Sequence, residues 1–281
     1  MGLARALISR SRSIYWSVRH SDRADLVGLR ILFYHRVSND HDDLAVSPKR
    51  FREQMAYLAH EGYQVTDVAS AAELLTKGKL PPRLIALSFD DGYLDVAENA
   101  LPVLAELGFR ATVFVVTGAL DGTATFGWYK RPPPLLSWAD VVRLDRDSPL
   151  AFEAHSVTHP NLVQVGDEEA RSELFGSKAA LEDRLGRSVS LFCYPGGFFG
   201  PRDRALAESA GYRFAASCEP GVNLPGEDPF TLRRTQIFPG DELFDFRAKV
   251  GGGHDSPLLI RSFYRRLRYG STVSRQRVRA R

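Results

Sequence analysis

Apolar runs of strand type alternate with helical patterns along this chain, and that order constrains the fold more than any other feature. Helix starts carry capping residues, as at Ser47-Pro48, where a serine N-cap precedes a proline in the first turn. A strand followed by a helix, repeated along the chain, indicates right-handed βαβ units and a parallel sheet. The predicted strands are Arg30–His35, Leu84–Phe89, Ala111–Val116, Leu150–Ala154, Val189–Tyr194, Arg213–Ser217 and Thr231–Phe238.

The absence of a glycine-rich G-x-G-x-x-G turn after the first strand leaves a dinucleotide-binding sheet unsupported. The 281 residues are 44% hydrophobic, which is ample for one core. We therefore predict an α/β fold, a distorted (β/α) barrel of about seven parallel strands in a single domain. The helices predicted between and after the strands include Leu94–Leu107, Ser137–Leu144, Asp167–Leu185, Pro201–Ala210 and Asp241–Val250.

Charge divides the chain into three parts. Residues 256–281 carry eight arginines and no acidic residue, and residues 1–28 are also basic, which leaves an acidic body over residues 29–255. A nucleic-acid enzyme would be expected to carry its basic patch within the folded domain, so no nucleic-acid partner is predicted. The basic ends would suit peripheral contact with an anionic membrane surface. Solvated tails are the plainer alternative.

The first twenty residues are basic but are broken by Arg5, Arg10, Arg12 and Arg19, so they lack the apolar core of a signal peptide. No stretch approaches the ~20 apolar residues of a membrane span. We therefore expect a cytoplasmic protein, in peripheral contact with the inner face of the membrane if the basic ends bind lipid. Cysteine usage shows no disulfide framework or zinc-type pair. We read the two cysteines as small buried hydrophobes, with a bridge between them as the alternative.

Polar residues gather where the predicted strands end. In parallel α/β barrels the carboxyl ends of the strands form one face, and that face carries the active site. Segments far apart in sequence should therefore converge there. The segments are His35, Asp90-Asp91-Gly92, His155 with His159, and Tyr194-Pro195-Gly196-Gly197.

Two histidines and a carboxylate at this face predict a metal. His155 and His159 are four residues apart, a spacing that places both imidazoles on one side of a helical turn. The pair is not the HExxH of a zinc protease, because no glutamate follows the first histidine. Two imidazoles and one carboxylate leave positions open for water and substrate. Non-haem iron oxygenases use the same set, but a second carboxylate beside the ligand favours hydrolysis, which needs a base.

These motifs resemble the polysaccharide deacetylase family, whose shared region is the NodB homology domain. Ser88–Gly92 (SFDDG) matches the family's (T/S)FDDG motif, and His155–His159 (HSVTH) matches its H(S/T)xxH motif. Tyr194–Gly197 (YPGG) is similar to a variant of its third motif. The resemblance covers about residues 30 to 250. It implies a distorted barrel, a divalent metal and the removal of N-acetyl groups from glycans.

The resemblance also implies roles for individual residues. Asp91, His155 and His159 would bind the metal, and Asp90 would be the base. The backbone N–H of Gly196 would stabilise the oxyanion. Zinc is the first expectation for the metal, although the ligand set would also accept cobalt, nickel or manganese.

The sequence departs from the family pattern in two places. Many members carry an arginine where this chain has Cys193. We predict that Arg234 replaces it, with Arg233 as the alternative and a purely structural arginine as the plainest reading. The C-terminal histidine that serves as general acid in many members is also missing. A branch of the family supplies it from an early Tyr-His strand end, and His35 is preferred here over His254, with a core histidine as the alternative.

Substrate contacts are predicted for Tyr194 and for two aromatic residues, Trp128 and Tyr129, in the Gly/Pro-rich segment 118–134. The expected partner is an N-acetylated glycan: a polysaccharide, an oligosaccharide or a lipid-linked precursor of cell-surface exopolysaccharide biosynthesis. One alternative is hydrolysis of a non-sugar amide, such as a cyclic ureide or imide, on the same barrel. Another is a non-catalytic glycan-binding module. The sequence specifies neither the glycan nor an oligomeric state.

Overall fold

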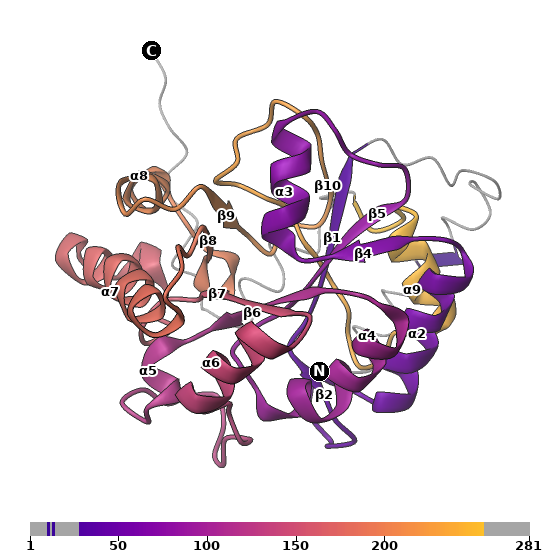
Figure 1. Ribbon diagram of the computed structural model, residues 1–281, viewed down its shortest axis with the longest axis horizontal. Coiled ribbons are helices and arrows are strands. Elements are labelled where there is room, and N and C mark those ends of the chain that lie inside the picture. Colours follow the sequence, from indigo (N-terminus) through magenta and orange to yellow (C-terminus); the bar gives the residue numbers. More distant parts are fainter. Residues whose placement is uncertain (1–9, 12, 15–27, 256–281) are drawn as a thin grey trace.

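A curled sheet lies at the centre of the computed structural model, with helices packed around it (Figure 1). The structure describes residues 10–11, 13–14 and 28–255. The predicted arginine-rich tail 256–281 and nearly all of the basic segment 1–28 therefore lie outside the described residues. The strands are β1 (Leu29–Tyr34), β2 (Arg36–Val37), β3 (Ala45–Val46), β4 (Gln64–Thr66), β5 (Leu84–Phe89), β6 (Ala111–Val115), β7 (Leu150–Ala154), β8 (Leu191–Cys193), β9 (Phe214–Ala216), β10 (Val222–Asn223) and β11 (Thr235–Gln236).

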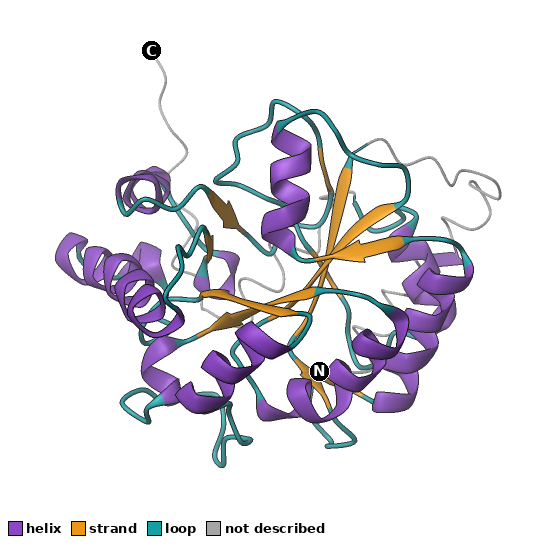
Figure 2. Ribbon diagram, viewed as in Figure 1, coloured by secondary structure: helices purple, strands orange, loops and turns teal. Residues whose placement is uncertain are grey.

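The main sheet has the order β10-β1-β5-β6-β7-β8-β9, with β11 also paired to β1 and β4 to β5. All of these pairs are parallel except β1 with β10. Figure 2 shows the strands running through the middle of the molecule with the helices outside them. The α/β class and the distorted barrel with mostly parallel strands are therefore confirmed.

The helices begin and end where local chemistry favours it. Ser47 accepts a hydrogen bond from the Arg50 N–H and caps α2, as predicted, and Gly186 ends α7 in a left-handed conformation. The α-helices are α2 (Pro48–His60), α3 (Val68–Thr76), α4 (Leu101–Leu107), α5 (Thr117–Leu120), α6 (Trp138–Asp147), α7 (Asp167–Leu185), α8 (Pro201–Ser209) and α9 (Leu243–Val250).

The predicted helix Leu94–Leu107 differs from the structure. A π-helical turn, Val96–Ala100, precedes α4 there, and Pro102 lies in the first turn of α4. Proline has no N–H to donate, so the α-helical ladder cannot run unbroken through this position. The last predicted strand is also shorter than expected. Arg234 comes just before the two-residue β11 rather than within a longer strand.

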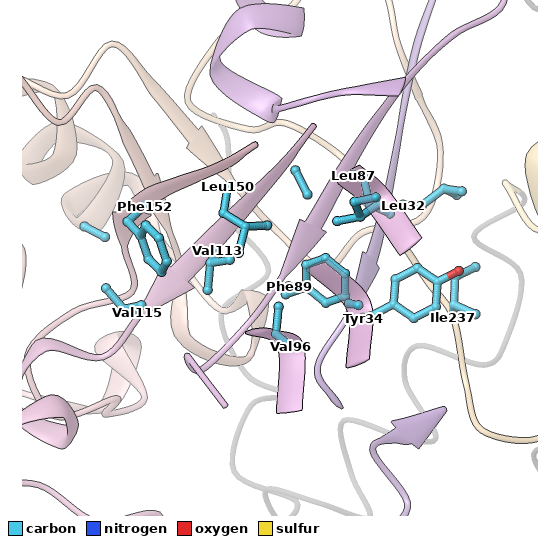
Figure 3. Packing of buried hydrophobic residues seen from close by; sticks show 14 of the residues in the cluster. Leu32, Tyr34, Leu87, Phe89, Val96, Val113, Val115, Leu150, Phe152 and Ile237 are labelled. Atoms are coloured by element: carbon cyan, nitrogen blue, oxygen red, sulfur yellow. The ribbon is translucent and has the colours of Figure 1, made fainter. Parts of the chain in front are cut away.

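The sheet is buried on both faces. Alternate residues of β1 and β5 point to opposite sides, so Leu32 and Leu87 join one apolar cluster while Ile31 and Ala86 join another, with α3 packed against the second. Figure 3 shows the first cluster, in which side chains of β1, β5, β6 and β7 lie in one layer, with Val96 and Ile237 beside them. Because the sheet is packed on both faces, its strands have fixed positions, and so do the strand ends that carry the polar residues.

Candidate metal centre and active site

The two adjacent aspartates leave β5 through a backbone turn that aims both at one site. The Asp90 N–H donates to the Tyr34 carbonyl at 3.0 Å and so continues the pairing of β5 with β1. Asp91 and Gly92 then adopt left-handed conformations, with φ of 73° and 77°. A left-handed aspartate is uncommon and a left-handed glycine is not. Both carboxylates are buried.

His155 and His159 leave β7 in an irregular loop, not on the helical turn that their spacing predicted. Ser156 and His159 have φ of 68° and 62°, which no right-handed helix contains. The two imidazole rings nevertheless lie 4.8 Å apart. The Nδ1 atom of His155 lies 2.8 Å from the Cys193 carbonyl oxygen, which fixes a proton on Nδ1 and leaves the Nε2 lone pair facing Asp91.

The three side chains form a donor set that fits a divalent cation. The Oδ1 atom of Asp91 lies 3.6 Å from Nε2 of His155 and 3.6 Å from Nε2 of His159. This oxygen is buried and has no hydrogen-bond partner among the described residues, which is costly unless a cation compensates it. Burial, and next the charge of His159, lower the pKa of His155 to about 4, so its imidazole is neutral and able to ligate.

A second set, Asp90 with His155 and Cys193, also lies within ligating distance but fits a metal poorly. Burial raises the pKa of the Cys193 thiol well above its ordinary value, so the thiol is protonated. Both oxygens of Asp90 are already engaged by Arg234. The metal-binding geometry therefore belongs to Asp91, His155 and His159.

Arg234 holds Asp90 in a bidentate ion pair. Its Nη1 and Nη2 atoms donate to the two carboxylate oxygens at 2.6 and 2.9 Å, and its Nε donates to the Ser217 carbonyl at 2.9 Å. The guanidinium is fully buried and lies over the rings of Phe33 and Phe114, 4.3 and 5.2 Å from their centroids. Burial tends to raise the pKa of Asp90, but the charge and hydrogen bonds of Arg234 outweigh it and hold the pKa below its ordinary value.

The arginine predicted to replace the missing third-motif residue thus reaches the aspartate it was expected to orient. Arg233, the alternative, faces outward beside Glu227. Cys193 occupies the usual arginine position, and its sulfur lies 2.9 Å from Nη2 of Arg234. Cys218 also lies near this nitrogen, at 3.6 Å. The structure has no disulfide bond between these two cysteines, so the alternative of a bridge between them is wrong.

His35 lies at the end of β1, half-buried, within electrostatic range of both aspartates. Burial raises the pKa of Asp91 above its ordinary value, and the electrostatic contribution of His35 opposes that shift. His35 also adds a small lowering contribution to the pKa of Asp90, behind that of Arg234. Its Nδ1 atom lies 3.5 Å from the amide nitrogen of Gln236. The alternative histidine, His254, instead lies beside Ser13, with its Nε2 atom 3.2 Å from the serine hydroxyl. The structure therefore brings His35, and not His254, to the paired carboxylates.

Gly196 lies in the short 3₁₀ turn Pro195–Gly197 that follows β8, with φ of 60°. The next residue, Gly197, is packed so closely that an added Cβ would come within 2.5 Å of the Cys218 backbone nitrogen. β8 pairs with β7, so this turn follows the strand end beside His155. The third motif is thus placed next to the second, as its position after a neighbouring strand predicted.

Comparison with known proteins agrees with this geometry. Residues 77–215 match the family model for polysaccharide deacetylases. YxkH of Bacillus subtilis (strain 168), named as a polysaccharide deacetylase, is 27% identical over 213 residues, which is 75% of this chain and 72% of that protein. A poly-β-1,6-N-acetyl-D-glucosamine N-deacetylase of Staphylococcus aureus (strain MRSA252) is 22% identical over 230 residues, covering 79% of this chain and 77% of the relative.

Among solved structures, the deacetylase PplD of Streptococcus pyogenes shares the fold, with a TM-score of 0.71 and 23% identity over 80% of this chain and 98% of that one. This chain therefore carries a polysaccharide deacetylase domain over residues 77–215. It is therefore a carbohydrate deacetylase, and the predicted family, fold class and enzyme class are confirmed. None of the helices in the described part of this deacetylase combines the length and apolarity that a membrane crossing needs.

Of the three predicted substrate-binding aromatics, Trp128 lies beside the candidate metal ligand His159, and Tyr129 lies next to Trp128 with their ring centroids 6.3 Å apart. Trp128 is 42% exposed, and its indole lies edge-on to His159, with ring centroids 5.1 Å apart. It stacks on the buried ring of Phe126 at 4.7 Å. The Tyr129 hydroxyl donates to Asp42 at 2.6 Å.

The prediction that the third aromatic, Tyr194, contacts the substrate is wrong. Its side chain is fully buried, stacks on Phe199 at 4.4 Å and donates its hydroxyl to the Phe230 carbonyl. Both its ring and its hydroxyl are therefore occupied within the core. The strand β8 carries it inward just before the turn, and the sequence motif alone could not show on which side of the sheet it points.

The sequence did not predict two acidic residues that lie at the site. Asp42 joins Tyr129 to Arg36, which follows His35, and Glu173 of α7 contacts the loop between the two histidines. Glu173 has no sequence signal that separates it from the other acids of its helix. The charged helix Asp167–Leu185 was predicted with its observed bounds, but the face turned to the metal loop depends on how α7 packs.

Proposed function

We propose that this protein is a metal-dependent N-deacetylase of N-acetylated amino sugars within a glycan chain of the poly-N-acetylglucosamine type. The observation that carries the proposal is the buried Oδ1 of Asp91, which has no hydrogen-bond partner among the described residues and lies 3.6 Å from each of two imidazole nitrogens. The neighbouring Asp90 is held by an ion pair with Arg234. The substrate class is supported by the Staphylococcus aureus relative, which is named for that polymer and aligns with most of this chain.

Asp91, His155 and His159 would hold the metal. When bound, a divalent cation would polarise the acetamide carbonyl and lower the pKa of a water molecule toward ~7. Zinc is the first choice for two imidazoles and one carboxylate, and cobalt, nickel or manganese would also suit this set. The irregular loop and the left-handed Asp91 would bring the three ligands together without a helical turn.

Asp90 is the proposed base that accepts a proton from the attacking water. Its lowered pKa keeps it ionised at neutral pH, as a base must be. The bidentate contact with Arg234 fixes both carboxylate oxygens, so the proton acceptor has one orientation. Arg234 thus acts through Asp90 and is a positioning residue.

His35 and Gly196 complete the proposed reaction. The amide oxygen gains negative charge as the carbonyl carbon becomes tetrahedral, and the Gly196 N–H would donate a hydrogen bond to it. One such donor typically contributes about 2.7–4 kcal/mol to the transition state. His35, in its protonated form, would give a proton to the departing sugar nitrogen, which leaves as an amine while acetate is released. Its position within electrostatic range of both aspartates supports this role.

The exposed ring of Trp128 is the proposed contact for a sugar ring beside the reacting one. Its face is held by Phe126 and lies at the rim of the metal ligands. Flat aromatic faces bury the apolar face of a sugar without requiring deep closure. Cytoplasmic location and contact of the basic ends with a membrane stay predictions.

Acetate release from N-acetylglucosamine oligomers tests the proposal. We would compare β-1,6-linked and β-1,4-linked oligomers of increasing length, with chelator and then with added Zn²⁺ or Co²⁺. Metal-dependent acetate that rises with the length of the β-1,6 series is expected. Release that chelator leaves unchanged would refute the metal proposal, and acetate from neither series would refute the substrate class. Asp91→Ala serves as the inactive control.

A further inference from the structure

The loop between the two histidines is fixed by a buried carboxylate from a different part of the chain. Oε2 of Glu173, on α7, accepts hydrogen bonds from the N–H groups of Val157 at 2.7 Å and Thr158 at 2.8 Å. Its Oε1 accepts from the Thr158 hydroxyl at 2.6 Å. Glu173 is buried and makes no salt bridge among the described residues. The donors of the loop therefore supply the compensation that a buried carboxylate needs.

The backbone conformation of this loop is strained and depends on contacts with the rest of the fold. Ser156 and His159 both adopt left-handed conformations, which non-glycine residues populate only when the surroundings enforce them. The loop carbonyls are also held, since the N–H groups of Thr117 and Gly118 donate to Ser156 and Val157. Glu173 forms hydrogen bonds with Val157 and Thr158, which lie between these two strained positions. Loss of these hydrogen bonds would change the backbone conformation that leads to His159.

We infer that Glu173 is a positioning residue for the metal centre, one that sets the place of His159 relative to His155 and Asp91. The inference rests on the proposed metal-dependent function. His155 is anchored at the end of β7 and by the Cys193 carbonyl. His159 lies four residues further along a loop, so its place depends on the backbone that Glu173 holds. Outer groups that orient ligands typically change metal affinity by roughly 10- to 100-fold when they are removed.

The test compares two glutamates of the same helix. Glu173→Gln keeps the size of the side chain but replaces one acceptor oxygen with an amide NH₂ that opposes the loop donors. Glu182→Gln is the matched control, because Glu182 also accepts from a backbone N–H, that of Val189 at 2.9 Å, and from Lys178. Its contacts lie away from the metal loop. The Zn²⁺ dissociation constant of each full-length protein is measured by chelator competition, and thermal unfolding of each metal-free protein is followed in parallel.

We expect Glu173→Gln to raise the Zn²⁺ dissociation constant by at least ~10-fold, while Glu182→Gln lowers the unfolding temperature with no change in metal affinity. The visible spectrum of the Co²⁺-loaded protein should also change for Glu173→Gln alone. Equal affinity in native protein and Glu173→Gln, with an unchanged spectrum, would overturn the inference while leaving the proposed function intact. A native chain that binds no metal would overturn both.

A milder variant keeps the inference testable if Glu173→Gln does not fold. Thr158→Val removes the hydroxyl that donates to Oε1 of Glu173 and leaves both backbone contacts. We expect a smaller loss of Zn²⁺ affinity in the same direction. A folded Thr158→Val protein with native affinity and a native Co²⁺ spectrum would count against the inference.

Discussion

On one side of the site, Asp90 and Arg234 are buried at the strand ends and nearly every polar atom has a partner. On the other side, the loop 121–135 presents an exposed indole beside His159, held by a stack and by one hydrogen bond at its edge. The buried side can orient a charge without help from solvent. The exposed side is accessible to the proposed glycan substrate, which must bind and dissociate.

The difference follows from the environment of each group. A bidentate ion pair shielded from water is strong and has one geometry, which suits a step that moves a proton. An aromatic face in contact with water gains by being covered, which suits binding. Substitutions on the buried side should therefore change kcat, and those on the exposed side should change KM.

The largest effect is expected from the paired aspartates, which separate metal binding from proton transfer. Asp91→Ala should abolish both metal binding and acetate release, because it removes the carboxylate ligand. Asp90→Asn should keep the metal and lower kcat by about 10²–10⁴-fold, the usual range for a general base. Metal content and acetate release are measured on the same samples. A near-native rate in Asp90→Asn would refute the base assignment.

The second-largest effect is expected at Arg234, which orients the proposed base Asp90. Arg234→Lys keeps the charge but cannot reach both oxygens of Asp90 and the Ser217 carbonyl together. We expect kcat to fall by roughly 10- to 100-fold with little change in KM or Zn²⁺ affinity. Steady-state kinetics with a metal-affinity measurement checks this. Arg233→Lys, on the outward-facing neighbour, is the control, and an equal loss there would argue for a purely structural role.

A smaller effect is expected on the exposed side. Trp128→Ala removes the aromatic face at the rim, and a loss of about 1–1.5 kcal/mol of binding would raise KM by roughly 10-fold for an oligomer. The kcat should stay near its native value because the substitution leaves every proposed metal ligand and the base Asp90 in the chain. Kinetics with a short and a long oligomer checks the split. A fall in kcat at unchanged KM would break the division between the two sides.

The smallest effect is expected at Tyr129, in the loop 121–135. Tyr129→Phe removes the hydrogen bond to Asp42 and should lower the free energy of unfolding by about 1 kcal/mol at pH 7. Burial tends to raise the pKa of Asp42, but hydrogen bonds from Tyr129 and Arg36 hold it below its ordinary value.

A group whose pKa is lowered by folding stabilises the fold above its unfolded pKa and loses that contribution as the pH falls. The stability difference between native protein and Tyr129→Phe should therefore shrink below about pH 4. Urea unfolding at pH 7 and at pH 3.5 measures it. A difference that stays constant over this range would show that the hydroxyl contributes without its charged partner.

Much of the fold was readable because local signals and burial agree. β5, β7 and α7 have the predicted bounds, since an apolar run or a capped charged helix leaves little choice of state. The segment between Gly62 and Leu84 was not assigned, yet it holds β4 and α3. Helix α3 is short and largely apolar, so periodicity alone could not separate it from a buried strand.

The site was predictable as a set of residues and less so as a geometry. The motifs identified Asp90, Asp91, His155 and His159, and the strand order explains why they meet. The histidine spacing suggested a helical turn, but the structure has a strained loop, because its contacts with Glu173 and with the residues after β6 outweigh the local helical preference.

The sequence by itself determined which atoms could bind a metal and accept a proton, since those are properties of side chains and of the strands that carry them. Tertiary structure alone decided which groups support them. Arg234 lies 144 residues from Asp90 in sequence, Glu173 was one acid among several on its helix, and Tyr194 turned inward to the core. Such pairings depend on which faces of packed elements meet, and the one-dimensional spacing of residues does not encode that directly.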